Sequence, residues 1–235
     1  MGSIERGLIE KMETLPLLQG VSRNDVSRLV QAAHRKNLQE GEFFFLQGDP
    51  AERMYVLLQG RVKLTQVGPD GQQALIRVIT PVSLFALVAI TKADDYLVTA
   101  QAAEDCQALY WTRRELMGFV LEVPQLALNA MGIMADNLQE IQERFRQVTT
   151  EPVEQRLAHT LIRLAAQSGK SVNQGILIDL SLTRQDLAEM SGTTLYTASR
   201  MLSQWEKQGL VITGRKRVII RDTHGLARIV KAGTE

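Results

Sequence analysis

Residues 181–217 read SLTRQDLAEMSGTTLYTASRMLSQWEKQGLVITGRKR, and this stretch decides the C-terminal half of the fold. Thr183 with Asp186 three residues later is a helix-start pattern, and Ser191-Gly192 interrupts the apolar period that follows. A second apolar period begins at Thr193 or Thr194, and basic residues follow it. The stretch therefore predicts a helix, a tight turn, a second helix and a basic two-stranded hairpin. The expected inward residues of the second helix are Leu195, Ala198, Leu202 and Trp205.

The outward face of this second helix carries small hydroxyls, one tyrosine and one arginine. Hydroxyl groups hydrogen-bond phosphates, and an arginine can bond the edge of a guanine through two donors. Such a face suits a helix that lies in the major groove of DNA. A helical hairpin that packs for structure alone is the alternative, but it does not account for the basic hairpin that follows. The outward residues are Thr194, Tyr196, Thr197, Ser199, Arg200 and Ser203.

The run LTRQDLAEM-SGTT-YTASR-L closely resembles the winged helix-turn-helix of the Crp/Fnr family of bacterial transcription regulators. The resemblance implies that Arg200 reads a guanine, with Ser199 before it as in the Fnr branch, and that Tyr196 stands where a glutamate is common. The pattern TTLYTASR also resembles that of regulators controlling nitric-oxide reduction and denitrification genes. The phosphate contacts that the resemblance implies are Thr183, Gln185, Thr194 and Thr197. The basic tip of the hairpin, with Lys216 and Arg217, is itself well placed for phosphates.

The resemblance covers nearly the whole chain of 235 residues and implies an α+β fold. An N-terminal cyclic-nucleotide-binding-like β jelly roll is expected at 1–123, a dimerisation helix at 124–150 and the winged helix-turn-helix domain at 151–235. Short apolar strands between turn residues from Leu38 to Trp111 favour the jelly roll independently. The net charge of +1 divides into +4 from residue 151 onward (12 Lys+Arg, 8 Asp+Glu) and −3 before it (15 and 18). This asymmetry fits nucleic-acid contact by the C-terminal domain.

Residues 124–149 predict one long helix with apolar residues spaced alternately by four and three. This is a heptad seam sustained for more than three heptads, and it predicts a parallel coiled-coil homodimer. Pro152 ends the helix, and we expect effector binding to move a hinge between Thr149 and Pro152. After Ala127, the expected dimer-interface residues are Met131, Met134, Leu138, Ile141, Phe145 and Val148.

The effector is expected to bind in the jelly roll, in the segment that holds the ligand in the cyclic-AMP-binding relatives. There a Gly-Glu pair and an Arg-Ser or Arg-Thr pair hold the nucleotide, whereas this chain has Ala86-Leu87 and Val98-Thr99. Without the glutamate for the ribose and the arginine for the phosphate, cyclic AMP is not the expected effector. The open alternatives are an apolar effector site, a filled barrel with no effector, and another cyclic-nucleotide-like ligand. The expected pocket residues are Leu84, Phe85, Leu87, Val88, Ile90, Val98 and Thr99.

The cofactor prediction starts from few ligand residues. One cysteine, Cys106, excludes a four-cysteine iron–sulfur cluster within one chain, and it is expected to be a buried apolar residue. Haem, as a nitric-oxide sensor, is a candidate cofactor for an apolar pocket, and histidine is the usual axial ligand. The histidines His34, His159 and His224 all lie outside the pocket segment, and His34 is expected at the end of an N-terminal helix. Met and Tyr remain alternative ligands.

An enzyme or a cupin-like metal site is the rival from another class. Three scattered histidines do not form the clustered ligand set that such a metal site needs, and no catalytic constellation is evident. The sequence therefore predicts a non-enzymatic regulator whose partners are double-stranded DNA, a second copy of itself and RNA polymerase. An activator and a repressor remain open alternatives. The absence of a long apolar run predicts a cytoplasmic protein without a membrane-spanning segment.

Overall fold

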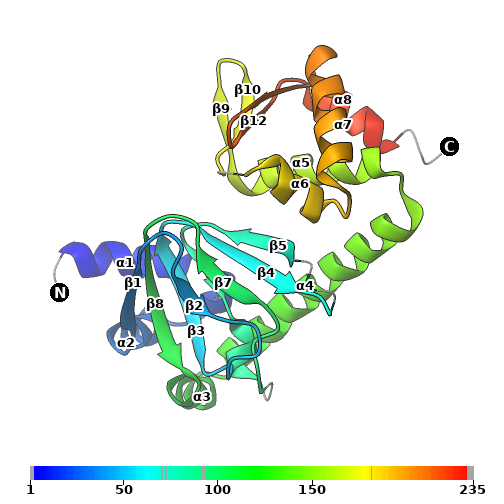
Figure 1. Ribbon diagram of the computed structural model, residues 1–235. Coiled ribbons are helices and arrows are strands. Elements are labelled where there is room, and N and C mark those ends of the chain that lie inside the picture. Colours follow the sequence, from blue (N-terminus) through cyan, green and yellow to red (C-terminus); the bar gives the residue numbers. More distant parts are fainter. Residues whose placement is uncertain (1–2, 70, 72, 92–93, 181, 232–235) are drawn as a thin grey trace. The chain divides into compact units, whose positions relative to one another are not determined.

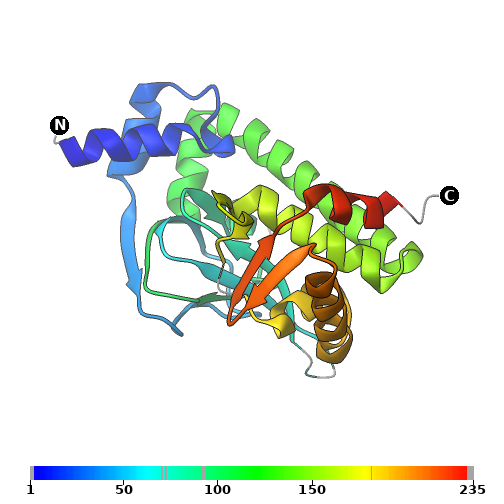
Figure 2. The same ribbon diagram turned by 90° about the horizontal axis from the view of Figure 1, so that it is seen from above.

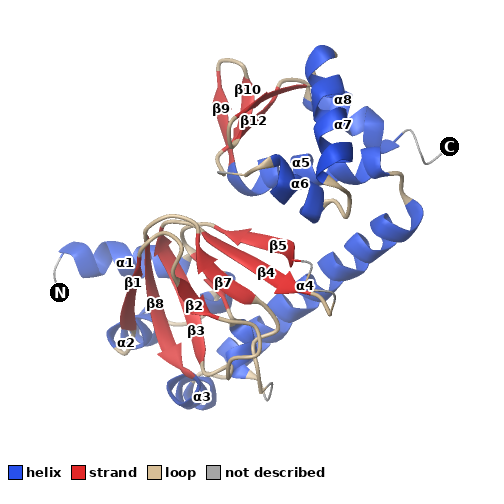
Figure 3. Ribbon diagram, in the orientation of Figure 1, coloured by secondary structure: helices blue, strands red, loops and turns tan. Residues whose placement is uncertain are grey.

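The computed structural model describes residues 3–69, 71, 73–91, 94–180 and 182–231. It divides into two compact units, Met1–Gln139 and Glu140–Glu235 (Figure 1). Strands dominate the first unit, whereas the second combines helices with a small sheet (Figure 3). The boundary between the units falls inside the predicted dimerisation helix. The expected α+β fold is confirmed.

Two four-stranded antiparallel sheets form the roll of the N-terminal unit. The sheet β1-β8-β3-β6 contains His34–Leu38, Cys106–Thr112, Arg53–Gln59 and Ser83–Phe85. The sheet β2-β7-β4-β5 contains Phe43–Phe45, Thr99–Ala102, Val62–Val67 and Gln73–Ile79. Buried residues of both sheets share one core, among them Phe44, Tyr55 and Val62. The core therefore lies between the sheets, as in a jelly roll.

Helices cover one side of the roll with a second apolar core. They are α1 (Ser3–Glu13), the 3-10 helix η1 (Pro16–Leu18), α2 (Arg23–Gln31), η2 (Leu87–Ile90) and α3 (Arg113–Glu122). Ser22 caps α2 by accepting from the Asp25 N–H, as its sequence position predicts. Trp111 is fully buried here and donates to the Leu29 carbonyl at 2.8 Å, which fixes α2 to the sheet.

Helix α4 (Gln125–Thr150) matches the predicted long helix. Its first turns bury Leu126 and Ala130 against the second core, and Asn129 donates to the carbonyls of Leu17 and Gln19. Among the described residues, no single helix is long and apolar enough to cross a membrane; only α3 and α4 together, bent by 115°, reach that length and composition.

The C-terminal unit contains the predicted helix-turn-helix. It comprises α5 (Val153–Ser168), β9 (Gly169–Val172), β10 (Gly175–Ile178), α6 (Arg184–Met190), α7 (Leu195–Lys207), β11 (Val211–Gly214), β12 (Arg217–Ile220) and α8 (Thr223–Lys231). The strands form one antiparallel sheet in the order β11-β12-β10-β9. Figure 2 shows β11 and β12 beside α7.

The structure corrects two placements and adds elements that the sequence did not predict, α3 and β9 among them. His34 is the first residue of β1 and not the end of a helix, because it pairs in register with Tyr110 of β8. Leu195 is 47% exposed and not an inward residue, because it is the first residue of α7, before the helix meets its neighbours. Helix α3 and strand β9 were not predicted, since the first lacks a clear apolar period and the second is largely polar.

Candidate nucleic-acid interface and effector cavity

Helix α6 is positioned by the predicted N-cap. The Thr183 side chain accepts from the Asp186 N–H, and Asp186 accepts from the Thr183 N–H at 2.7 Å, which completes a capping box. Leu187 and Ala188 are fully buried on the inner face of the helix. Gln185 is exposed and donates to Glu189 at 2.9 Å. The Thr183 hydroxyl also donates to Asp186 at 2.9 Å. To donate to a DNA phosphate, this hydroxyl would have to give up its hydrogen bond to Asp186.

Helix α7 presents the residues that were predicted to face DNA. Tyr196 is 74% exposed and Arg200 is also exposed, one helical turn further along the same face. Thr194 caps the helix by accepting from the Thr197 N–H at 3.2 Å, and its hydroxyl donates to the Thr197 hydroxyl at 3.0 Å. Ser199 is partly exposed. The exposed face thus combines one cationic fork, one phenol and hydroxyls near the helix N-terminus.

The inner face of α7 holds that surface in place. Ala198, Leu202 and Trp205 are all fully buried. The Trp205 indole donates to Glu154 of α5 at 3.2 Å, so α7 is fixed to the first helix of the unit as well as to α6. This arrangement lets α7 present its outer side chains from a rigid support.

The wing is fastened to both helices through one residue. Glu206 of α7 accepts from the Thr213 N–H at 2.8 Å and from its hydroxyl at 3.1 Å, while Arg184 of α6 donates to that hydroxyl at 3.1 Å. The hydrogen bonds from Thr213 hold the pKa of Glu206 below its ordinary value. At the tip, Lys216 has φ of +55° and is exposed together with Arg217. The two predicted phosphate contacts of the wing are therefore available to solvent.

Arg156 connects the turn of the helix-turn-helix to the end of α4. Its guanidinium donates to the carbonyls of Ser191 at 3.0 Å and Gly192 at 2.9 Å, and also to those of Glu151 at 3.0 Å and Val148 at 3.5 Å. Carbonyls at the end of a helix lack partners within the helix, and a cation is favoured there. The sequence analysis did not select Arg156, because these partners lie up to 36 residues away.

The residues predicted for an effector pocket divide between different surroundings. Leu84, Leu87 and Ile90 pack with the core beneath the helices, whereas Phe85, Val88 and Val98 pack with the core between the sheets. Thr99 accepts a hydrogen bond from the Gln47 N–H at 3.0 Å. Only Leu84, Phe85 and Leu87 of the predicted set line a cavity of about 300 Å³ in the N-terminal unit.

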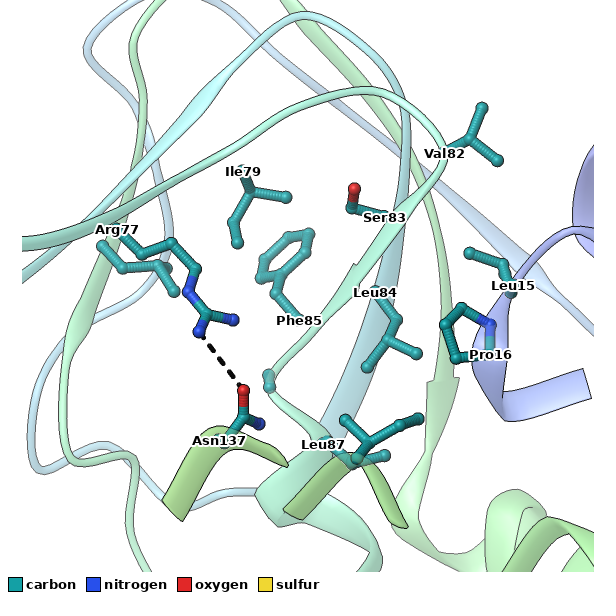
Figure 4. Close-up of a pocket in the computed structure, with 13 residues that line it drawn as sticks. Leu15, Pro16, Arg77, Ile79, Val82, Ser83, Leu84, Phe85, Leu87 and Asn137 are labelled. Carbon is teal, nitrogen blue, oxygen red and sulfur yellow. Dashed lines mark hydrogen bonds between the residues drawn. The ribbon is translucent and has the colours of Figure 1, made fainter. Parts of the chain in front are cut away.

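This cavity has one polar end and an otherwise apolar lining (Figure 4). At that end, Arg77 of β5 donates to the Asn137 side chain of α4 at 3.2 Å, while Ser83 adds a hydroxyl to the lining beside Val82 (Figure 4). Arg77 and Asn137 were missed because they lie 60 residues apart. The signal available in the sequence is an arginine two residues before Ile79 in a predicted strand. The apolar lining residues are Leu15, Pro16, Leu64, Ile79, Val82, Leu84, Phe85, Ala86, Leu87 and Ile133.

The predicted dimer seam is largely exposed in the single chain. Met131, Leu138, Ile141, Phe145 and Val148 are between 55% and 70% exposed. Met134 is different, because it is partly buried against the core beneath the helices. Most of the seam is therefore an uncovered apolar row on α4, a pattern that marks interaction surfaces.

The single cysteine is buried, and His34 and His159 each contact a glutamate. Cys106 is 2% exposed, as expected, and its burial raises the pKa of the thiol. His34 contacts Glu115 at 2.8 Å and stacks on Tyr110, and His159 lies 3.5 Å from Glu151. His224 is exposed on α8. None of the three histidines is among the described residues that line the cavity.

Comparison with known proteins matches both halves of the chain. Residues 35–122 match the cyclic nucleotide-binding domain family, and residues 155–229 match the Crp-like helix-turn-helix domain family. The chain is 23% identical over 212 residues to the CRP-like cAMP-activated global transcriptional regulator of Mycobacterium tuberculosis, covering 90% of this chain and 95% of the relative. It is 25% identical to the cyclic AMP receptor protein of Thermus thermophilus, with 93% and 98% covered.

Among solved structures, FixK2 from Bradyrhizobium japonicum superimposes with a TM-score of 0.74 at 22% identity. The superposition covers 84% of this chain and 96% of FixK2, so the likeness of fold includes both units. With a helix-turn-helix match that includes α6, α7 and the wing, and relatives similar over nine-tenths of its length, the chain belongs to the Crp/Fnr family of DNA-binding transcription regulators.

Proposed function

We propose that this protein is a homodimeric activator whose two α7 helices read an inverted repeat in DNA. The observation that carries the proposal is the exposed Arg200–Tyr196 face on a helix that is buried on its other side. The exposed row on α4 supports a symmetric dimer, since such a row pairs with its own copy around a two-fold axis. Half-sites would then lie about one helical turn, ~34 Å, apart. RNA polymerase is the proposed further partner at the promoter.

The N-terminal unit is proposed to sense an effector other than cyclic AMP. Two relatives are named for cyclic AMP, but this chain has Leu87 and Val98 where the nucleotide-binding pattern needs a glutamate and an arginine. The cavity beside Leu84, Phe85 and Leu87 supports an effector with an apolar part. A regulator with no effector, controlled by its abundance alone, is the alternative if no ligand alters DNA binding.

Nitric-oxide sensing through haem rests on the resemblance of the recognition helix. The apolar lining of the cavity supports it, whereas the placement of the three histidines does not. An anaerobic absorption spectrum after haem reconstitution, with and without nitric oxide, tests it. A stoichiometric Soret band that shifts with the gas would favour haem, and the lack of a saturable band would remove this candidate.

The DNA-reading role is tested by Arg200→Ala on an operator found by selection from random DNA. A bidentate arginine–guanine contact contributes about 1–3 kcal/mol of discrimination, so the variant should lose roughly 10- to 100-fold in affinity for the selected site. The preference for guanine at one position of each half-site should disappear in a repeated selection. An unchanged sequence preference would contradict the role of Arg200.

Lys216→Ala is the matched control at the wing. A phosphate contact carries no base information, so this variant should weaken binding to all sequences alike and reduce the salt slope by about one. A loss restricted to the selected operator would show that the wing reads bases.

A further inference from the structure

Arg77 occupies an inward position in the roll. It pairs in register with Leu64 of β4, and Ile79 pairs with Val62. Directly opposed residues share a face of the sheet, as do alternate residues along a strand, so Arg77 lies in the same row as the buried Val62 and Ile79. Charged side chains are rarely placed in such rows, because removing the charge from water costs free energy.

The surroundings of Arg77 favour an anion with an apolar body. Its guanidinium and the side chain of Asn137 form one polar end of the cavity, the Ser83 hydroxyl lies apart from them beside Val82, and the rest of the lining is apolar (Figure 4). No aspartate or glutamate is among the described residues that line it. Figure 4 shows Arg77 directed at Asn137, with Leu84, Leu15 and Pro16 on the far side.

We infer that this cavity binds a small organic carboxylate with an apolar chain or ring. The planar guanidinium fork matches a carboxylate with two parallel hydrogen bonds, and the Asn137 amide beside it can add a further donor. The hydrocarbon part would lie among the leucines at the other end. A volume of about 300 Å³ is at the lower end for ligand pockets, which favours a compact molecule over a large cofactor. This inference rests on the proposed effector response and identifies the effector as an organic carboxylate.

Carboxylate binding would act directly on α4. Arg77 has interactions besides the one with Asn137, so the ligand would exchange partners at the guanidinium. Asn137 immediately precedes Leu138 of the exposed row. A ligand that competes for Arg77 therefore changes the contact between the roll and the helix that carries this row.

Calorimetric titration of the full-length protein with octanoate, octanol and octylamine tests the ligand class. Octanoate should bind saturably, and octanol should bind at least about 10-fold more weakly, because it lacks the charge that strengthens hydrogen bonds to the guanidinium. Octylamine should bind most weakly of the three. Equal binding of octanoate and octanol, or no saturable binding of octanoate, would overturn the inference.

Two variants test the assignment to Arg77. Arg77→Met should lose at least about 10-fold in octanoate affinity and little in octanol affinity, because only the carboxylate uses the guanidinium. Arg35→Met, at an exposed arginine of β1, is the matched control and should bind octanoate as the wild type does. If circular dichroism shows that Arg77→Met does not fold, Arg77→Lys replaces it. This variant keeps the charge but not the planar guanidinium, so its octanoate affinity should still fall below that of the wild type. Unchanged octanoate binding in a folded Arg77 variant would contradict the assignment.

Binding to the selected operator is measured on the same samples. If the operator is bound but octanoate is not, the ligand inference fails while the DNA-reading role stands. If octanoate binds and no sequence-selective DNA binding is found, the proposed function fails while the carboxylate site stands.

Discussion

Arg156 shows how one side chain can join two parts of a domain. Its four carbonyl partners belong to the end of α4, the segment after it and the turn between α6 and α7. The expected hinge between Thr149 and Pro152 therefore lies beside a guanidinium that also holds the helix-turn-helix turn. We expect a movement of this segment to be transmitted to that turn through Arg156.

Replacing Arg156 with methionine should reduce the free energy of unfolding by about 2 kcal/mol, because four carbonyls lose a charged donor while the side-chain volume stays similar. Urea denaturation of the wild type and the variant measures this difference. Arg221→Met, at an exposed arginine of the same unit, should change stability by less than about 0.5 kcal/mol. Equal effects of the two substitutions would argue against the connecting role of Arg156.

At the scale of elements, local caps fix the starts of α6 and α7, and one acidic residue links α7 to the wing. The capping box of α6 and the Thr194 cap of α7 depend on neighbours within three residues. The link from α7 to β11 depends instead on Glu206 and Thr213, and its donors lower the pKa of Glu206. We therefore expect this second link to weaken when Glu206 is protonated.

Glu206→Gln tests the pH dependence of that link. A carboxyl with a lowered pKa in the folded state stabilises the fold above its unfolded pKa, and this contribution disappears as pH falls through the folded pKa. The wild type should therefore have the higher Tm at pH 7, and the two melting temperatures should converge below about pH 4. Thermal melts at pH 7, 5 and 3 measure this. A difference in Tm that is constant from pH 7 to 3 would show that the charge of Glu206 is not involved.

For the whole molecule, the exposed row on α4 is the feature that a single chain leaves incomplete. Leu138, Ile141, Phe145 and Val148 continue a heptad period beyond the part of α4 that packs against the roll. Water-exposed apolar residues in this pattern are favoured when two helices pair. DNA reading by two α7 helices would then depend on this pairing.

Phe145→Glu should prevent dimerisation, because a dimer would place two carboxylates at its apolar seam. We expect the dimer dissociation constant to rise at least about 100-fold, as for loss of an interface hot spot, and affinity for the inverted repeat to fall with it. Analytical ultracentrifugation and DNA titration measure both. Leu121→Glu changes an exposed leucine of α3, outside the row, and should leave the dimer intact. A dimeric Phe145→Glu protein would exclude this seam as the interface.

The sequence by itself determined the elements whose signals are local. The Thr183 cap, the apolar period of α7 apart from Leu195, and the heptad row of α4 follow from spacings of two to seven residues, and the structure has them where they were predicted. Such patterns are readable because backbone geometry repeats over those distances. The family followed from the same short motifs.

Only the tertiary structure decided which side chains meet. Arg77 reaches Asn137 because the roll places β5 beside α4, and Arg156 reaches Gly192 because α5 packs under α6. The apolar residues predicted for one pocket divide between two cores for the same reason. A contact between residues dozens of positions apart depends on how sheets and helices close on one another, and no local period in the sequence carries that information.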